Sequence, residues 1–409
     1  MSDTELRLGE ELISPLHPVY DGVQVQQPPG PPYQAPDHPV WVVTRYRDAK
    51  TVLAHPDVRR DAEGAAELFT RKTGVHRPAI GAALTGHMLN ADPPDHTRLR
   101  SLVGRAFTRR QVERCRPRIE QLTEELLDHM AAKGHADLMG DFSVPLTIAV
   151  ICELIGVPEA ERGHIRSSWE RQAELLPPEQ AEELAQEQAA YLRSLIAAKR
   201  RQPADDLLTA LIEAGDAGEK LTDSELVAMV HLLLMAGFET TMNMIGNAAV
   251  TLLRHPDQLA AVRDDPELLP GALEELVRYD SPVCASMLRF TAAEVELDEV
   301  TIPAGEYVLV SNFAANHDPD RFDEPDRFDL TRKPEGHIGY GHGVHYCLGA
   351  PLARLEARIA LGQLLRRFPD LTLGVPVEEL QWLPITFLRA LISLPVSLGT
   401  PALSAPDRA

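Results

Sequence analysis

Cysteine is scarce in this chain, and the few that occur stand far apart. They are Cys115, Cys152, Cys284 and Cys347 in a chain of 409 residues, and no two of them form a CxxC pair. This spacing excludes a small disulfide-stapled scaffold and a paired-cysteine zinc finger. A chain of this length buries a sufficient core without cross-links, so the sequence predicts a reduced, cytoplasmic protein.

Basic residues are also in deficit: 40 Lys and Arg stand against 61 Asp and Glu, which gives a formal net charge of −21. A chain this acidic is not expected to bind nucleic acid or an anionic membrane. No run of 18 residues is free of polar side chains, and the first residues lack a basic segment followed by an apolar one. The sequence therefore predicts neither a membrane span nor a signal peptide.

The apolar residues follow a helical pattern over most of the chain. From Pro94 to about residue 290 they recur at spacings of three and four, and alternating β-branched segments occur only outside that range. We therefore expect a mainly α fold with small peripheral β-sheets, in one domain over residues 1–409. Residues 62–90, with weak periodicity, predict a long irregular loop. The expected helices are 48–55, 110–133, 144–155, 179–200, 206–213 and 271–279, and the expected strands are 40–44, 294–297, 307–310 and 391–397.

One further helix is apolar on almost every side. Thr222 and Glu225 have the capping-box spacing at its start, and Pro256 prevents it from continuing. Taken as Asp223–Arg254, it would be roughly 48 Å long, at 1.5 Å per residue. Because a helix that is apolar all round is buried, we expect it to run through the core.

A small polar group interrupts this helix at its middle, in the segment 236–241. Gly237 costs about 1 kcal/mol relative to alanine in a helix interior, and burial of Glu239 would raise the pKa of its carboxyl group. The Thr240 hydroxyl can bond back to the carbonyl of Ala236. These features indicate a site that handles protons beside a ligand. The alternative is a kink or a buried polar pair that only fixes packing.

Cys347 stands among small residues, with Gly339, Gly341 and Gly343 before it and Gly349 after it. Such a backbone lets a flat ligand approach closely. Residues 352–361 are strongly helical, so the sulfur would precede a helix N-terminus, where the helix dipole favours a thiolate. These features are typical of a cysteine that binds a metal or acts as a nucleophile.

Three other interpretations of this segment stay open. Gly341 and Gly343 could begin a dinucleotide-binding GxGxxG motif, although Tyr346 occupies the third glycine position and no strand precedes it. A zinc site is the second, although the sequence has no second ligand cluster. Its ligands would come from His337, His342, His345 and Cys347. A glycine-rich surface loop with an incidental cysteine is the third.

Three motifs together resemble the cytochrome P450 superfamily: the cysteine segment, the 236–241 interruption and the tetrad Glu275-Leu276-Val277-Arg278. They occur in the family's order, and the likeness extends from about residue 15 to the C-terminus. It looks most like the soluble bacterial members that tailor macrolides, peptides and other secondary metabolites. Tyr340 differs from the phenylalanine most common at the start of the cysteine loop. The resemblance implies the cytochrome P450 fold and haem b, iron protoporphyrin IX, as cofactor.

For the cofactor, the resemblance implies that Cys347 is the axial thiolate ligand of the haem iron. Backbone N–H groups around Leu348 and Gly349 would tune the sulfur. The haem propionates would be held by opposite charge, by His96, Arg100, Arg289 and His345. The remaining residues implied at the haem are Ala236, Gly237, Tyr340, Gly341 and Gly349.

For the reaction, the resemblance implies that Thr240 hydrogen-bonds the oxygen to be cleaved and that Glu239 relays protons to it. Thr241 is a weaker candidate for the same role, and packing is its alternative. A buried network of Glu275, Arg278 and Arg327 would brace the cysteine loop, although the Glu275–Arg278 pair alone is typical of a helix surface. The residues implied at the substrate are Phe238, Met287 and Phe387, and for Phe238 a place in the core is the alternative.

Local charge opposes the overall charge in residues 98–118, which contain eight arginines and one acidic residue, Glu113. A basic patch on an acidic protein steers a negatively charged partner. The resemblance implies that this partner is an acidic ferredoxin, itself reduced by a ferredoxin reductase. A solvated helix face is the alternative.

The function expected from the resemblance is a monooxygenase. It would hydroxylate or epoxidise a small organic substrate, a polyketide or peptide natural product, with O2 and electrons from the ferredoxin. Oxidative coupling or dehydrogenation by the same haem is the alternative within the family. Outside the family, the alternative is a zinc protein or a non-catalytic haem protein.

Overall fold

The computed structural model describes residues 24–26, 39–75, 81–173, 176–213, 221–383 and 387–401. Most of these residues are helical. The helices are α1 Tyr46–Ala54, α2 Ala62–Thr73, α3 Ala82–Thr85, α4 Asp95–Ala106, α5 Arg109–Arg114, α6 Arg116–Lys133, α7 Val144–Ile155, α8 Arg162–Ala173, α9 Pro178–Arg201, α10 Leu207–Glu213, α11 Asp223–Arg254, α12 Pro256–Asp264, α13 Leu269–Tyr279, α14 Asn312–Asn316 and α15 Ala350–Arg367. The predicted fold class, mainly α with small sheets, is confirmed.

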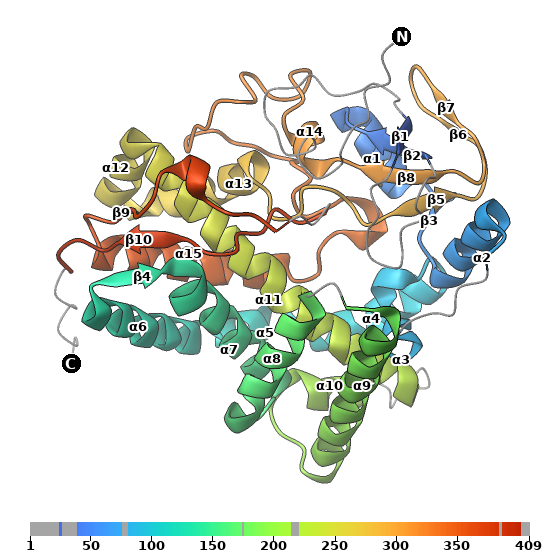
Figure 1. The fold of residues 1–409 in the computed structure, drawn as a ribbon, viewed down its shortest axis with the longest axis horizontal. Coiled ribbons are helices and arrows are strands. Elements are labelled where there is room, and N and C mark those ends of the chain that lie inside the picture. Colours follow the sequence, from blue (N-terminus) through green and yellow to red (C-terminus); the bar gives the residue numbers. More distant parts are fainter. Residues whose placement is uncertain are drawn as a thin grey trace.

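The strands form three small sheets. The strands are β1 Gln24–Gln26, β2 Pro39–Val43, β3 Val58–Arg59, β4 His135–Asp137, β5 Arg289–Thr291, β6 Val295–Glu296, β7 Thr301–Ile302, β8 Tyr307–Val310, β9 Thr372–Leu373 and β10 Pro395–Ser397. The largest sheet has the order β1-β2-β8-β5-β3, in which β2 and β8 are parallel and the other neighbours antiparallel. Strands β4, β10 and β9 form the second sheet, and β6 and β7 form the third. Figure 1 shows the largest sheet on one side of the molecule and the helices α6 to α9 on the other.

Helix α11 runs between these two parts, and its predicted bounds are confirmed. Both bonds of the capping box form: the Thr222 hydroxyl accepts from the Glu225 N–H at 3.2 Å, and the Glu225 carboxylate accepts from the Thr222 N–H at 2.8 Å. The helix is long and apolar enough to cross a bilayer, but 61% of its most apolar window is buried inside the protein. It packs against α7, α9 and α15. It is therefore the central helix of the core.

The prediction of an irregular loop over 62–90 is wrong for the first part of that range, where α2 forms. The Asp61 carboxylate caps the helix by accepting the Gly64 N–H at 2.7 Å, and Gly74 ends it in the left-handed conformation at φ 71°. Both are ordinary helix signals that outweigh the weak periodicity between them. The helix predicted over 110–133 is divided at Cys115 into α5 and α6, because Pro117 begins a new helix there.

Candidate functional site

The cysteine loop, residues 338–349, leads into α15. The Cys347 N–H donates to the Tyr340 carbonyl at 2.9 Å and the Gly341 N–H to the Ile338 carbonyl at 2.8 Å. Gly341 and Gly343 have φ angles of 76° and 72°, a region that side chains disfavour. A Cβ atom on Gly343 would also lie 2.7 Å from the carbonyl oxygen of Leu53, at the end of α1. The glycines are therefore required by the loop's own geometry and by its packing on α1.

Cys347 differs from the other cysteines in its surroundings. It is exposed, and the N–H groups of Gly349 and Ala350 bond to its sulfur. Even so, the surrounding protein desolvates the sulfur and raises the pKa of the thiol, an effect that outweighs these bonds and the nearby Arg100 and Arg354. The N–H groups at the helix start therefore favour the thiolate, as the sequence predicts, but they do not offset the desolvation. A coordinated metal ion would deprotonate this thiol.

The other three cysteines are suited to no such role. Cys152 and Cys284 are buried and Cys115 is partly buried. Burial raises the pKa of Cys115 and of Cys152 to about 11, and that of Cys284 to about 12. Because the pKa of Cys347 is raised as well, exposure is what distinguishes it, and Cys347 is the accessible thiol suited to bind a metal.

Buried hydrogen-bond donors converge beside the cysteine loop. The rings of His96, on α4, and His345 have centroids 4.3 Å apart. Among the described residues, none forms a hydrogen bond with either ring nitrogen of His96, with His345 Nε2 or with Arg289 Nε. The Asp92 carboxylate lies 3.9 Å from His345 Nε2, which is too far for a hydrogen bond. Buried donors without acceptors are costly, so this cluster fits a ligand that carries carboxylate oxygens.

The predicted propionate ligands His96, Arg289 and His345 thus lie together, and the pKa of each histidine is lowered in the protein alone. Burial, with help from Arg60 and Arg289, lowers the pKa of His345 to about 4. Burial and then the charge of Arg100 lower the pKa of His96. That both histidines hold the propionates by charge stays a prediction, because the carboxylates that would raise the pKa of each ring belong to the cofactor. Arg100 donates to the Tyr346 carbonyl at 2.6 Å, beside Cys347.

One residue of this cluster escaped the sequence prediction. Arg60 is only 8% exposed, and its Nε has no partner among the described residues. Its charge acts on His96 and His345, and the charge of Arg289 acts on Arg60. Arg60 comes from the end of β3, far from these residues in the sequence. No local pattern distinguishes it from Arg59, so only the strand pairing identifies it.

The polar interruption of α11 has an accessible side and a packed side. Ala236 is exposed and Glu239 and Thr240 are partly exposed, whereas Phe238 and Thr241 are buried. The Thr240 hydroxyl donates to the Ala236 carbonyl at 3.1 Å, as the sequence predicts, and the helix continues through this point. Burial raises the pKa of Glu239 to about 7. The accessible side therefore carries a carboxyl group that can exchange a proton near neutral pH and a hydroxyl group next to it.

Gly237 and Phe238 belong to the packed side. A Cβ atom on Gly237 would lie 2.5 Å from Ile151 Cδ1, so this glycine lets α7 pack closely on α11. Phe238 is fully buried, and its ring stands edge-on to Trp169 at a centroid distance of 5.0 Å. Phe238 is therefore a core residue, the alternative that the sequence left open. Met287 is 39% exposed and Phe387 is partly exposed, so both are accessible to a ligand.

The buried network at α13 differs from the prediction in one residue. Glu275 and Arg278 are completely buried and paired, with Nε–Oε2 at 2.7 Å. The second arginine is Arg332, whose Nε lies 3.1 Å from Glu275 Oε1. The predicted Arg327 is wrong, because its side chain is exposed and pairs with Glu324 and Asp329 instead. Arg327 and Arg332 lie on either side of Asp329 in the sequence. The turn between them directs only the Arg332 side chain toward Glu275.

A second network, which the sequence analysis missed, holds the start of the cysteine loop. Glu274 accepts from Arg354 Nε at 2.6 Å and from His337 Nε2 at 3.0 Å. The Arg354 guanidinium stacks over the Tyr340 ring at 4.3 Å, and the Tyr340 hydroxyl reaches the Met244 sulfur on α11 at 3.6 Å. Glu274 precedes Glu275 on α13, so two consecutive residues of this helix anchor two networks, of which that of Glu274 reaches the cysteine loop.

Comparison with known proteins agrees with this geometry. The family profile Cytochrome P450 matches residues 163–373. The chain is 49% identical to Cytochrome P450 107B1 of Saccharopolyspora erythraea, over 88% of this chain and 89% of that protein. The chain belongs to the cytochrome P450 family. This P450 is also 43% identical to 6-deoxyerythronolide B hydroxylase of the same organism, over 88% of this chain and 90% of that protein.

Solved structures of P450 enzymes share the fold as well. The structure of the tirandamycin C-bound P450 monooxygenase TamI superimposes with a TM-score of 0.84 at 42% identity, over 92% of this chain and 94% of that chain. This P450 is therefore an oxidoreductase of the monooxygenase class that binds thiolate-ligated haem.

The residues of this chain fit that cofactor. Cys347 is the accessible thiol with N–H bonds to its sulfur, and the buried donors of His96, Arg289 and His345 lack the acceptors that two propionates would bring. When bound, the haem supplies the activation of dioxygen. Cys347 would bind the iron, and the donor cluster would hold the propionate edge.

Proposed function

We propose that this P450 hydroxylates or epoxidises a polyketide or peptide natural product, with O2 and electrons from an acidic ferredoxin and its reductase, in the cytoplasm. The observation that carries the reaction type is that Glu239 and Thr240, which are adjacent in the sequence, both lie on the accessible side of α11. Support for the substrate class comes from the names of its relatives, one a hydroxylase of 6-deoxyerythronolide B and one a monooxygenase bound to tirandamycin C.

The substrate class is tested by titrating the holoenzyme with a macrolactone, 6-deoxyerythronolide B, and with a linear fatty acid, tetradecanoic acid. Displacement of the haem's water ligand by a substrate shifts the main visible absorption band. We expect the macrolactone to shift the band at a lower concentration than the fatty acid does. A response to the fatty acid alone would contradict the polyketide assignment.

The reaction type is tested on whichever compound is converted. The mass of a hydroxylated or epoxidised product exceeds that of the substrate by one oxygen atom. A product that has lost two hydrogen atoms and gained no oxygen would instead support dehydrogenation or coupling, the alternative within the family.

In our proposal, Thr240 and Glu239 divide the handling of protons. The Thr240 hydroxyl orients the hydrogen bond to the reacting oxygen. Glu239, whose burial raises the pKa of its carboxyl group to about 7, passes protons toward that oxygen from solvent. A carboxyl group with this pKa is partly protonated at neutral pH, so it can both give and recover a proton.

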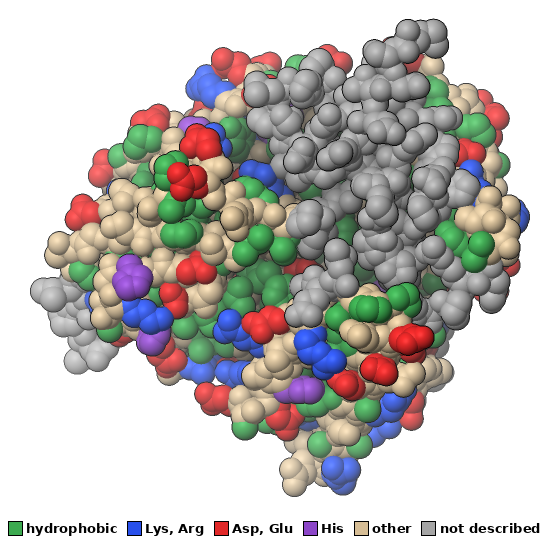
Figure 2. Space-filling model, in the orientation of Figure 1, with side chains coloured by type: hydrophobic (Ala, Val, Ile, Leu, Met, Phe, Trp, Pro, Cys, Tyr) green, Lys and Arg blue, Asp and Glu red, His purple; other side chains and the backbone are tan. Residues whose placement is uncertain are grey.

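The ferredoxin would bind a smaller basic surface than the sequence suggests. Four of the eight arginines in 98–118 are neutralised by ion pairs: Arg98 with Glu225, Arg114 with Asp205, Arg116 with Glu113 and Arg118 with Glu153. Arg105, Arg109 and Arg110 are exposed and form no ion pair with any described residue. On the face drawn in Figure 2, acidic and basic side chains are intermixed.

This reduced surface lies on the cysteine side of the protein. Helix α5, which begins at Arg109, packs against α15, the helix that follows Cys347. Val344 and Tyr346 of the cysteine loop are 49% and 40% exposed. Exposed arginines close to an exposed apolar loop suit a partner with acidic residues around an apolar centre.

Replacing Arg109 and Arg110 by glutamate is expected to slow reduction by ferredoxin at least tenfold at low ionic strength. It should also flatten the dependence of the rate on salt, because the attraction that salt screens is lost. Stopped-flow reduction of the holoenzyme measures both effects. The control replaces Arg193 and Arg201 by glutamate, since both are exposed on α9 and form no ion pair with any described residue. Equal slowing in the two double variants would contradict docking at Arg109 and Arg110.

A further inference from the structure

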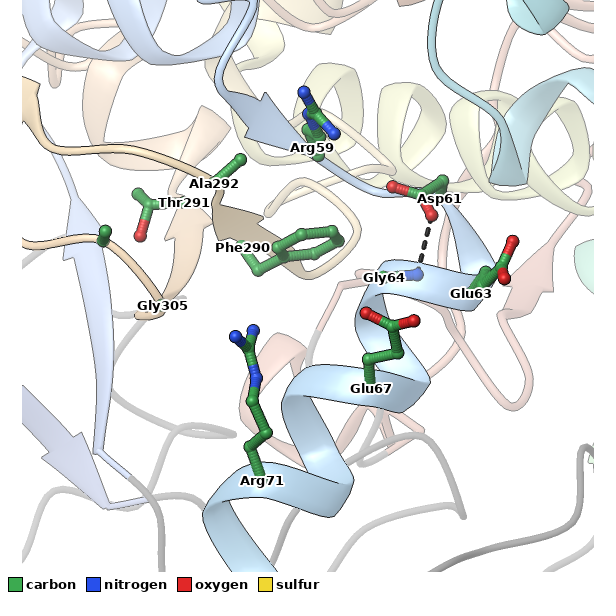
Figure 3. A pocket seen from close by; sticks show the side chains of 11 residues that line it. Arg59, Asp61, Glu63, Gly64, Glu67, Arg71, Phe290, Thr291, Ala292 and Gly305 are labelled. Atoms are coloured by element: carbon green, nitrogen blue, oxygen red, sulfur yellow. Dashed lines mark hydrogen bonds between the residues drawn. The ribbon is translucent and has the colours of Figure 1, made fainter.

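Strand pairing places Arg60 directly beside Arg289. In the antiparallel pair β3–β5, Val58 lies opposite Thr291 and Arg59 opposite Phe290. Arg60, which directly follows β3, and Arg289 come next along this register, and the charge of Arg289 acts on Arg60. Residues opposite each other project to the same face with their Cβ atoms about 5 Å apart. Arg59 and Phe290 share the other face, where both line a shallow surface pocket (Figure 3).

This arrangement sets two buried positive charges against each other. Arg60 is 8% and Arg289 5% exposed, and the Nε of each lacks an acceptor among the described residues. Burial, and then the charge of Arg289, lower the pKa of Arg60 to about 9, and burial lowers the pKa of Arg289 to about 10. Both groups are therefore still charged at neutral pH. Like charges opposite each other are destabilising, so the pair requires an anion.

The net charge of the cluster indicates how much negative charge its ligand must carry. Three guanidinium groups belong to the cluster, those of Arg60, Arg100 and Arg289, and the Asp92 carboxylate opposes the charges of Arg60 and Arg289. The Asp92 carboxylate already accepts hydrogen bonds from the backbone N–H groups of Arg60 and Asp61, at 2.9 and 3.0 Å. Counted without the histidines, these three guanidinium groups and one carboxylate carry two net positive charges. Two propionates carry two negative charges.

We propose that Arg60 is a further ligand of the haem propionates, and that its charge is needed for the balance between the site and the cofactor. This inference rests on haem binding at Cys347, as argued above. Without Arg60 the cluster would carry one net positive charge against two carboxylates, and one propionate would be buried without full compensation.

Arg60→Gln in the holoenzyme is expected to release haem to an excess of apomyoglobin about 10 to 100 times faster than the wild type. That range corresponds to the loss of one hydrogen bond between charged groups. The reduction potential of the haem should also fall, because a nearby positive charge favours the reduced iron. Arg60→Lys should restore most of both properties. Arg59→Gln is the matched control, since Arg59 is exposed on the opposite face of the same strand, and it should behave as the wild type.

Two outcomes would overturn the inference. One is a haem release rate and a potential in Arg60→Gln equal to those of Arg59→Gln. The other is failure of Arg60→Lys to restore either property, which would indicate a role in packing rather than in charge. A wild-type protein that holds no thiolate-ligated haem would instead refute the site itself, so the two failures are distinguishable.

Discussion

Glu275→Gln is expected to lower the free energy of unfolding of the holoenzyme by about 3 to 5 kcal/mol, the cost of removing one partner from a buried ion pair. The Glu275 carboxylate binds Arg278 through two bonds of 2.7 and 2.8 Å, and it also accepts from Arg332 and from the Asp329 N–H. Neutralising it leaves a fully buried guanidinium, Arg278, with no negative partner. Urea unfolding, followed by loss of the haem absorption, measures the change.

The same experiment tests the corrected identity of the third residue. Arg332→Gln removes the side chain that reaches Glu275, whereas Arg327→Gln removes an exposed one that pairs with Glu324 at the surface. We expect Arg327→Gln to cost no more than about 1 kcal/mol, as exposed ion pairs do, and Arg332→Gln to cost more. If Arg327→Gln proves as costly as Arg332→Gln, the assignment of the network is wrong.

Thr240→Ala is expected to separate electron consumption from product formation. The hydroxyl that would orient the hydrogen bond to the reacting oxygen is lost, so reduced nicotinamide is still consumed while hydrogen peroxide replaces product. We expect the ratio of product to nicotinamide to fall several-fold, with peroxide rising to match. The matched control is Thr241→Ala, because the Thr241 hydroxyl is buried and bonds to the Gly237 carbonyl at 3.3 Å. Equal uncoupling in both variants would show that the effect is structural.

Glu239→Gln is expected to act on rate rather than on coupling. The amide keeps the shape of the side chain but cannot titrate, so turnover should fall by at least tenfold, at the low end of the usual range for general acid–base groups. Burial raises the pKa of Glu239 to about 7, so the acid form is lost as pH rises through that value. Wild-type turnover should therefore fall as pH rises through about 7, and the variant should lack this inflection. An unchanged pH profile in the variant would remove Glu239 from the relay and favour a hydroxyl group of the substrate.

The sequence predicted best what is determined locally. The bounds of α11 follow from Thr222, Glu225 and Pro256, signals that act within one helical turn. Asp61 and Gly74 provide the same kind of signal for α2, but the weak periodicity between them favoured a loop. The back-bonded hydroxyl of Thr240 is likewise local, because it joins residues four apart.

What the sequence could not provide depends on contacts between distant segments. Arg60 meets Arg289 only through the pairing of β3 with β5, and Arg332 rather than Arg327 reaches Glu275 only because of the turn around Asp329. The thiol of Cys347 shows the same limit. Its helix position favours a thiolate, yet desolvation by the folded protein raises the pKa of the thiol.

The central claim is that Cys347 binds haem iron as a thiolate, and the spectrum of the reduced, CO-bound protein tests it most directly. The wild type should show a main band far to the red of that of an imidazole-ligated haem. Cys115→Ser, Cys152→Ser and Cys284→Ser, which change only buried or partly buried thiols, should keep that band, and Cys347→Ser should lose it. A thiolate-type band that persists in Cys347→Ser would contradict the account.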